Sequence, residues 1–213
     1  MRKASEIAYD YIRERVLGGT FLPAQRLVEV QLAQEIGVSR NSVRKALQQL
    51  EKDRLVSIRN NKGATVTALD LHHILQYYEV RIALERIIIR SAAENFTPAE
   101  LDELESAYRE MKALCEKQDF LNYSRGNLAF HDIIYRAARK PVVAGMIREI
   151  KTQLSRYQIR TMLVPGRAEQ SLREHQALLE AFRAKDVERA LDTIAVHLSS
   201  VSETIEKYIK IYY

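Results

Sequence analysis

The chain of 213 residues has a single cysteine, Cys115, and lacks any apolar run long enough to cross a membrane. One cysteine excludes an intramolecular disulfide framework, which is typical of a protein from a reducing compartment. A membrane-spanning helix needs about 20 apolar residues, and the N-terminus is charged and amphipathic instead of carrying an apolar signal core. These absences predict a soluble cytoplasmic protein, and a hydrophobic content of 46% predicts a packed core.

Glycine and proline are scarce in the second part of the chain. Residues 69–213 contain three glycines and three prolines and have no convincing strand pattern. Thr97-Pro98-Ala99-Glu100 is a capping box with proline at the first helical position, which is typical of a helix N-terminus. Apolar periodicity predicts a mainly α protein whose second part is an antiparallel bundle of about six helices. We place these helices at residues 70–95, 98–117, 119–138, 141–163, 167–184 and 186–210.

The excess positive charge lies entirely in the first part of the chain. Residues 1–68 hold 12 Lys and Arg against 7 Asp and Glu, whereas residues 69–213 hold 21 of each class. We therefore predict two domains with a boundary between residues 68 and 69, just before Asp70. A basic module joined to a neutral one indicates a head that binds a polyanion and a body with another task.

The basic module contains the pattern of a helix-turn-helix. Predicted helices cover residues 4–17, 27–36 and 40–53, and Gly37 supplies the left-handed backbone that ends the second one. Ser39 is a good N-cap for the third helix. The face of this helix opposite its apolar residues carries guanidinium and amide groups that suit phosphate oxygens and base edges. A solvated helix face explains these groups equally well when this helix is taken alone. The residues on that face are Arg40, Asn41, Arg44 and Gln48.

A predicted β-hairpin follows the three helices. Residues 55–59 and 64–67 read as strands, and Asn60-Asn61-Lys62-Gly63 between them is a hairpin turn signal. Three helices and a hairpin form a winged helix-turn-helix, in which the basic loop tip can reach the DNA backbone or minor groove. This arrangement favours the DNA-binding interpretation. The candidate DNA-binding residues are Ser39, Arg40, Asn41, Arg44, Lys45, Gln48, Lys62 and Gly63.

Three histidines lie on the apolar faces of three predicted bundle helices. His131 continues a stripe with Leu128 and Ile134, and His175 and His197 occupy similar positions on their own helices. A single buried histidine is more often a core residue with a satisfied hydrogen bond. Three that converge are harder to explain in this way, because an unpaired buried polar group destabilises the fold. Imidazoles on facing helices suit a divalent transition metal such as Zn²⁺ or Ni²⁺.

The helix-turn-helix residues belong to a longer pattern. It runs Leu27…Leu32-Ala33…Gly37-Val38-Ser39-Arg40…Val43-Arg44…Ala46-Leu47…Leu50-Glu51…Leu55-Val56…Gly63…Val66. This pattern, over nearly all of residues 5–68, resembles the GntR family of bacterial transcription regulators. The family's usual Ser-Arg-Thr-Pro is Ser39-Arg40-Asn41-Ser42 here, and its usual glutamate after the second arginine is Lys45. The resemblance implies DNA contacts at Arg40, Asn41, Arg44 and Gly63.

The all-helical second part resembles the ligand-binding domain of the FadR subfamily. Many of these domains bind a metal through an aspartate and three histidines, and the histidine positions match His131, His175 and His197. The aspartate position is Asn127, whose amide oxygen can coordinate a metal without a negative charge. The resemblance also implies an effector cavity near Arg81 and Glu85. Arg81 could bind a carboxylate bidentately, although an ordinary helical ion pair explains both residues as well.

Together these features predict a homodimeric, ligand-responsive regulator, most simply a repressor, that reads a pseudo-palindromic operator in double-stranded DNA. A small carboxylate-bearing metabolite would bind in the bundle and shift the relative positions of the heads. Two alternatives remain open: a sensor whose effector is the metal itself, and a metalloenzyme with a DNA-binding head. An enzyme is the weaker alternative, because the sequence has no HExxH motif and we expect Glu174, beside His175, to point to a different helix face.

Overall fold

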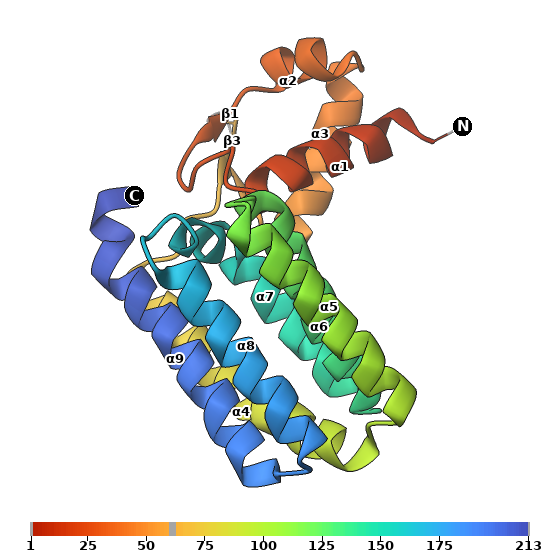
Figure 1. Ribbon diagram of the computed structural model, residues 1–213. Helices are drawn as coiled ribbons and strands as arrows, with labels where there is room; N and C mark the ends of the chain where they lie inside the picture. The colour runs from red at the N-terminus through yellow and green to blue at the C-terminus, as the bar shows by residue number, and fades with distance from the viewer. Residues whose placement is uncertain (1, 60–62, 213) are drawn as a thin grey trace.

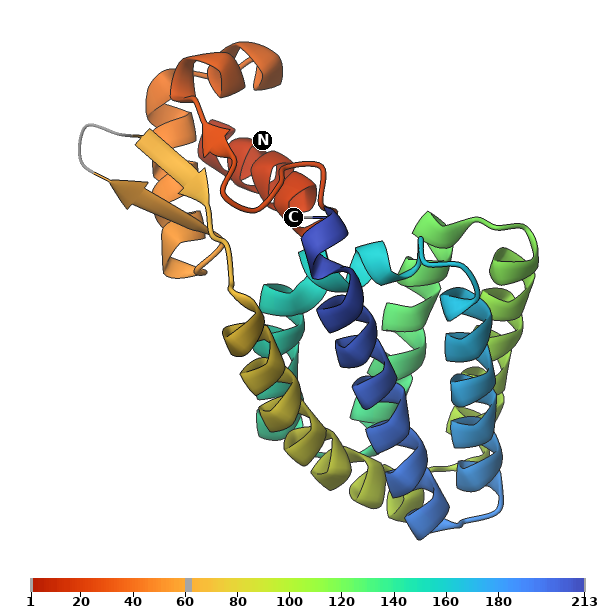
Figure 2. The same ribbon diagram turned by 90° about the vertical axis from the view of Figure 1, so that its left-hand side faces the viewer.

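The computed structural model describes residues 2–59 and 63–212, which form a small head on one end of a helical bundle (Figures 1 and 2). The elements of the head are α1 (Ala4–Leu17), β1 (Arg26–Leu27), α2 (Glu29–Ile36), α3 (Arg40–Lys52), β2 (Val56–Arg59) and β3 (Gly63–Val66). The elements of the bundle are α4 (Leu71–Asn95), α5 (Pro98–Glu116), α6 (Phe120–Ala137), α7 (Pro141–Thr161), α8 (Arg167–Arg183) and α9 (Val187–Tyr212). This architecture confirms the predicted winged helix-turn-helix and six-helix bundle.

The turn and third helix of the head form as local chemistry requires. Gly37 ends α2 with a φ of 74°, a left-handed conformation that glycine adopts without a Cβ clash. Ser39 then caps α3, because its side chain accepts a hydrogen bond of 3.1 Å from the backbone N–H of Ser42. The buried face of α3 joins the head's core through Val43, Ala46, Leu47 and Leu50.

One short strand differs from the sequence prediction. We expected a single helix over residues 27–36, but Arg26–Leu27 forms β1 and the helix begins at Glu29. Leu27 pairs with Ala64 of β3, so its backbone completes a three-stranded sheet of order β1-β3-β2. A strand of two residues has no detectable period, and only its partner strand identifies it. Residues 60–62, with the predicted wing-tip Lys62, lie outside the described residues.

The bundle has its own core, separate from that of the head. Each helix begins and ends within two residues of its predicted bounds, and Thr97 and Glu100 form the expected capping box at the start of α5. Helix α4 packs against α6, α7 and α9, while α8 packs against α5 and α9. No helix in the described ranges is both long and apolar enough to span a membrane.

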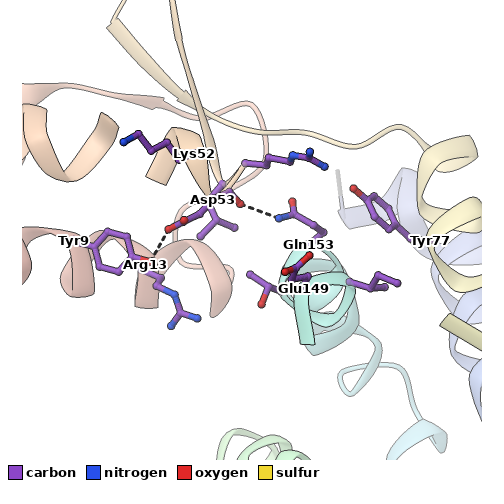
Figure 3. Close-up of a pocket in the computed structure, with 11 residues that line it drawn as sticks. Tyr9, Arg13, Lys52, Asp53, Tyr77, Glu149 and Gln153 are labelled. Atoms are coloured by element: carbon purple, nitrogen blue, oxygen red, sulfur yellow. Dashed lines mark hydrogen bonds between the residues drawn. The ribbon is translucent and has the colours of Figure 1, made fainter. Parts of the chain in front are cut away.

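The head meets the bundle at α7. The side chain of Gln153 donates a hydrogen bond of 2.9 Å to the carbonyl of Asp53, the residue that caps the end of α3. Tyr9 of α1 donates to the Asp53 carboxylate at 2.6 Å. These contacts border a cleft of about 480 Å³ between head and bundle, with Tyr77 and Glu149 on its bundle side (Figure 3). The end of α3 is therefore bonded directly to a bundle helix.

Replacing Gly37 by alanine is expected to lower the free energy of unfolding by about 1 kcal/mol, because a Cβ strains a left-handed backbone. Gly145 in α7 is a matched control, since it is helical and an added Cβ there meets nothing within 4 Å. Gly145→Ala should raise the free energy of unfolding by about 0.5–1 kcal/mol. Urea unfolding followed by circular dichroism measures both changes. Changes of the same sign would contradict this account of Gly37.

Candidate metal centre and nucleic-acid interface

Three histidines meet in the interior of the bundle. His131 of α6, His175 of α8 and His197 of α9 are all at least 96% buried. One ring nitrogen from each lies within 4.8 Å of the other two. The Nε2 atoms of His131 and His175 are 3.2 Å apart. The predicted convergence of the three imidazoles is thus present in the fold.

The second nitrogen of two of these rings has a fixed partner. His175 Nδ1 lies 2.6 Å from the carbonyl oxygen of Ser171, to which it can donate, and His197 Nδ1 lies 2.7 Å from a Glu174 oxygen. Such bonds orient an imidazole and leave its Nε2 lone pair available to a metal ion. Within the described residues, His197 Nε2 is buried without a hydrogen-bond partner, and so is Asn127 Oδ1 one turn before His131. These orphaned atoms fit a site that binds a cation.

The electrostatics keep these rings neutral. Burial lowers the pKa of His131 and His175 well below 6.5, and the charge of nearby Lys151 lowers both further. Burial also lowers the pKa of His197, although the Glu174 carboxylate works in the opposite direction. A neutral imidazole is the form that binds a metal. Three such nitrogens leave a further coordination position for Asn127 or another ligand.

Glu174 corrects the sequence analysis. We expected it to point to a different helix face from His175 and to take no part in the site, but its Oε2 lies 2.7 Å from His197 Nδ1 and also accepts a hydrogen bond of 3.2 Å from Arg167. Residue 174 faces α9 because α8 packs against that helix, a neighbour that the sequence does not identify. Leu128 is a second correction, since it is 49% exposed and does not continue the inward stripe of His131.

Arg81 and Glu85 lie in the same interior and are completely buried. Arg81 Nε donates to Glu85 Oε1 at 3.3 Å, and the Tyr135 hydroxyl donates to the same oxygen at 2.7 Å. Burial disfavours the charge of Arg81, but Glu85 and Tyr135 outweigh this effect and raise its pKa. Neither Nη atom of Arg81 has a hydrogen-bond partner in the described part of the chain. These two nitrogens are donors available to an anion.

Two further cations near this centre were missed by the sequence analysis. Burial lowers the pKa of Lys151 on α7 to about 8, and the charge of Arg81 adds to the effect. Arg167 at the start of α8 is 3% exposed and pairs with Glu174. The available signal was a basic residue at a helical position that faces the core, where lysine and arginine are unusual. This signal is weak, because long cationic side chains can also extend over the helix surface to solvent.

The exposed face of α3 carries the predicted DNA-binding residues. The side chains of Arg40 and Arg44 are 63% and 55% exposed. Glu29 of α2 accepts two hydrogen bonds from Arg44, at 3.1 and 2.9 Å, and this arginine lowers the pKa of Glu29. Gly63 begins β3 with a φ of 80°. Four further predicted residues are also exposed, namely Ser39, Asn41, Lys45 and Gln48, while Lys62 lies outside the described residues.

Comparison with known proteins identifies both parts of the chain. Residues 4–66 match the family described as bacterial regulatory proteins, gntR family, and residues 76–200 match the FCD domain. The chain belongs to the GntR family and carries an FCD domain. It is therefore a DNA-binding transcription regulator, and the members of these families are regulators rather than enzymes.

Individual relatives agree with this assignment. The chain is 27% identical over 199 residues to the uncharacterized HTH-type transcriptional regulator YdhC of Bacillus subtilis, covering 93% of this chain and 89% of that protein. It is 25% identical over 215 residues to the galactonate operon transcriptional repressor of Escherichia coli, covering 91% and 93%. The structure of E. coli McbR/YncC has the same fold, with a TM-score of 0.78 and 24% identity, covering 100% of this GntR regulator and 98% of that chain.

Breaking the buried ion pair of this regulator should strongly lower its free energy of unfolding. Glu85→Ala is expected to lower the free energy of unfolding by about 3–5 kcal/mol, because it leaves the Arg81 charge buried without a carboxylate. Glu103→Ala is the control, since Glu103 pairs with Arg136 at the surface. That change should lower the free energy of unfolding by about 1 kcal/mol or less. Urea unfolding compares the two, and similar losses would contradict the buried-pair argument.

Proposed function

We propose that this GntR regulator is a homodimeric, cytoplasmic repressor controlled by a small carboxylate-bearing metabolite that binds in the bundle beside a divalent metal ion. The main support is the juxtaposition, in one buried region, of three neutral imidazoles and the unbonded Nη atoms of Arg81. The first set suits a transition metal, and the second suits an anion. Release from the operator would then depend on a ligand held by both.

The proposed metal ligands are His131, His175 and His197, with the Asn127 amide oxygen as a fourth donor. FCD domains can bind metal ions, and three histidine nitrogens suit Zn²⁺ or Ni²⁺. Glu174 would orient His197 through its Nδ1, in the way that carboxylates support metal-bound histidines. Asn127 contributes no charge, so all four proposed donors are neutral.

The proposed effector site lies at Arg81 and Glu85. Glu85 holds Arg81 through Nε only, which leaves the Nη edge of the guanidinium for a carboxylate. Lys151 titrates near pH 8, so it is mostly charged at neutral pH and adds positive potential. A ligand with a carboxylate and a metal-binding oxygen would satisfy both the ion and Arg81. Monoanionic hydroxy acids and similar metabolites belong to this class.

The proposed operator-binding surface is the exposed face of α3, together with the wing. In a winged helix-turn-helix this helix enters the major groove, and two heads related by a two-fold axis read a pseudo-palindromic site. We keep the two domains at residues 1–68 and 69–213, a boundary that falls between the two family matches. The role of Lys62 stays a prediction.

The proposed route between the two sites runs through α7. Lys151 of α7 faces the buried centre closely enough to lower the pKa of His131, and Gln153, two residues later, bonds to Asp53 at the end of α3. Movement of α7 on ligand binding would therefore reposition the recognition helix. Regulation requires the ligand to bind one arrangement of α7 more tightly than the other.

Metal binding is tested by competition with a chelator at fixed pH. His131→Ala is expected to lose nearly all Zn²⁺ or Ni²⁺ binding, and Asn127→Asp should bind more tightly because it adds a negative charge to a neutral donor set. His72→Ala is the matched control, since His72 is exposed on α4. Unchanged metal content in His131→Ala would return the histidines to a packing role. Equal affinity in Asn127→Asp and the wild type would remove Asn127 from the ligand set.

DNA binding is tested on the regulator's own promoter region by fluorescence anisotropy over a range of salt concentrations. Arg44→Ala should weaken specific binding by about 1–3 kcal/mol if the guanidinium reads a base edge. Arg109→Ala on α5 is the control for losing one exposed arginine. Addition of metal alone, and then of candidate carboxylates, distinguishes a metal sensor from a metabolite-responsive repressor. Wild-type protein that binds no promoter fragment would refute the proposal.

A further inference from the structure

A second buried arginine, Arg167, has donors that its carboxylate partner does not use. Arg167 lies at the start of α8, is 3% exposed and donates from Nη2 to Glu174 at 3.2 Å. Its Nε and Nη1 atoms are buried and have no hydrogen-bond partner in residues 2–59 and 63–212. A buried guanidinium with unbonded donors destabilises the fold, so these two atoms favour an acceptor from outside the chain.

The hydroxyl of Tyr78 on α4 is also buried without a partner. Tyr78 is 2% exposed, and its Oη atom has no hydrogen bond to any of the described residues. The hydroxyl of a buried tyrosine usually finds such a bond. Burial raises the pKa of Tyr78 to about 12, so the hydroxyl keeps its proton at neutral pH. It is therefore a hydrogen-bond donor.

Tyr78 lies near both buried arginines. Arg81 follows it by three residues on α4, and Arg81 Cζ is 5.9 Å from the centroid of the Tyr78 ring. The charges of Arg81 and Arg167 both oppose the effect of burial on the pKa of Tyr78, and both add to the effect of burial on that of His197. Charges shift a pKa strongly only at short range. The two guanidiniums therefore lie near the same hydroxyl and the same imidazole.

The unbonded donors form two groups. Arg81 offers both Nη atoms, while Arg167 offers Nε and Nη1 in addition to the Tyr78 hydroxyl. Each group suits a carboxylate, because hydrogen bonds between a guanidinium and a carboxylate are charge-assisted and strong. A molecule with one carboxylate would satisfy one group and leave the other unbonded. A molecule with two carboxylates can satisfy both.

Charge balance also favours two anionic groups. Each buried arginine is already compensated by a carboxylate, in the pairs Arg81–Glu85 and Arg167–Glu174. A divalent ion on neutral donors would add two positive charges, and Lys151, whose pKa is about 8, adds another in most molecules at neutral pH. A monoanion offsets one of these charges, whereas a dianion offsets two. Uncompensated charge in a buried region is unfavourable.

We propose that the effector of this regulator is a dicarboxylate, with one carboxylate on Arg81 and the other on Arg167 and the Tyr78 hydroxyl. This inference rests on the proposed function and narrows its ligand class from acids with one carboxylate to acids with two. The second carboxylate would bond to α4 and α8 together, because Tyr78 and Arg167 belong to different helices. A bound ligand would therefore restrain these two helices relative to each other.

Isothermal titration calorimetry of the Zn²⁺-loaded full chain tests the second carboxylate. The probes are L-malate, 2-hydroxyglutarate and 2-hydroxyadipate, each compared with the monoamide in which a neutral amide of nearly the same size replaces the carboxylate far from the hydroxyl. At least one dicarboxylate should bind about tenfold or more tightly than its monoamide, because hydrogen bonds to a charged group are the stronger ones. The Zn²⁺ content measured after each titration excludes removal of the ion by the probe.

Tyr78→Phe separates ligand binding from packing. It removes a buried hydroxyl that has no partner in the described chain, so the urea midpoint of the ligand-free protein should stay the same or rise. Tyr135→Phe is the matched contrast and should lower the midpoint, because that buried hydroxyl donates to Glu85 at 2.7 Å. In the Zn²⁺-loaded protein, Tyr78→Phe should weaken binding of the preferred dicarboxylate by about tenfold and have a much smaller effect on its monoamide. Tyr108→Phe, which removes a hydroxyl bonded at the surface of α5, should change neither affinity.

The outcomes distinguish the two proposals. A wild type that binds no Zn²⁺, or that binds no probe when it is loaded, would overturn the proposed function and this inference together. Equal affinity for every dicarboxylate and its monoamide would overturn the dicarboxylate alone. A preference for dicarboxylates that Tyr78→Phe leaves intact would overturn the position of the second carboxylate. A lower urea midpoint in Tyr78→Phe would do the same, because it would show that the hydroxyl bonds within the chain.

Discussion

The burial of ionisable groups inside a helical bundle is the constraint on which the rest of this structure depends. Helix packing satisfies backbone groups but supplies no partners for imidazole or guanidinium side chains. Two carboxylates supply some of these partners. Glu85 accepts hydrogen bonds from Arg81 and Tyr135, and Glu174 bonds to His197 and Arg167. Within the described residues, the Nη atoms of Arg81, His197 Nε2 and Asn127 Oδ1 are buried without a hydrogen-bond partner. Buried polar atoms of this kind favour a ligand that bonds to them.

Function in this fold follows from helices whose opposite faces have different tasks. On α7, Lys151 faces the buried centre and Gln153 faces the head, where it bonds to the end of α3. On α4, Arg81 is buried in the interior while Ala83, two residues later, is exposed. A helix is stiff over such short distances, so displacement of one face displaces the other. Helix α7 thus connects the buried centre to the head, and α4 connects it to the outer side of the bundle.

The sequence predicts this fold well because its signals are local and strong. Gly37 and Ser39 mark a turn and a cap through backbone chemistry that needs no tertiary information. The three histidines could be placed on inward faces by periodicity, but their convergence depends on which helices are neighbours. The prediction for Glu174 was wrong for the same reason, because the direction of its side chain depends on α9, which begins more than ten residues later in the chain. Lys151 and Arg167 were not predicted near the centre, because long cationic side chains occur on both buried and exposed helix faces.

The charge balance of the interior limits the kind of ligand that could join a metal there. Three imidazoles and the Asn127 amide are neutral donors, so a divalent ion would keep its full charge. Arg81 remains charged beside Glu85, and Lys151, with a pKa of about 8, is mostly protonated at neutral pH. A loaded centre would therefore carry excess positive charge in a buried region, which is unfavourable unless an anion compensates it. An anionic group in the open coordination position would stabilise the metal, and the metal would strengthen the binding of that anion by the same free energy. The neutral residue at position 127 thus favours a regulator in which metal and carboxylate bind together.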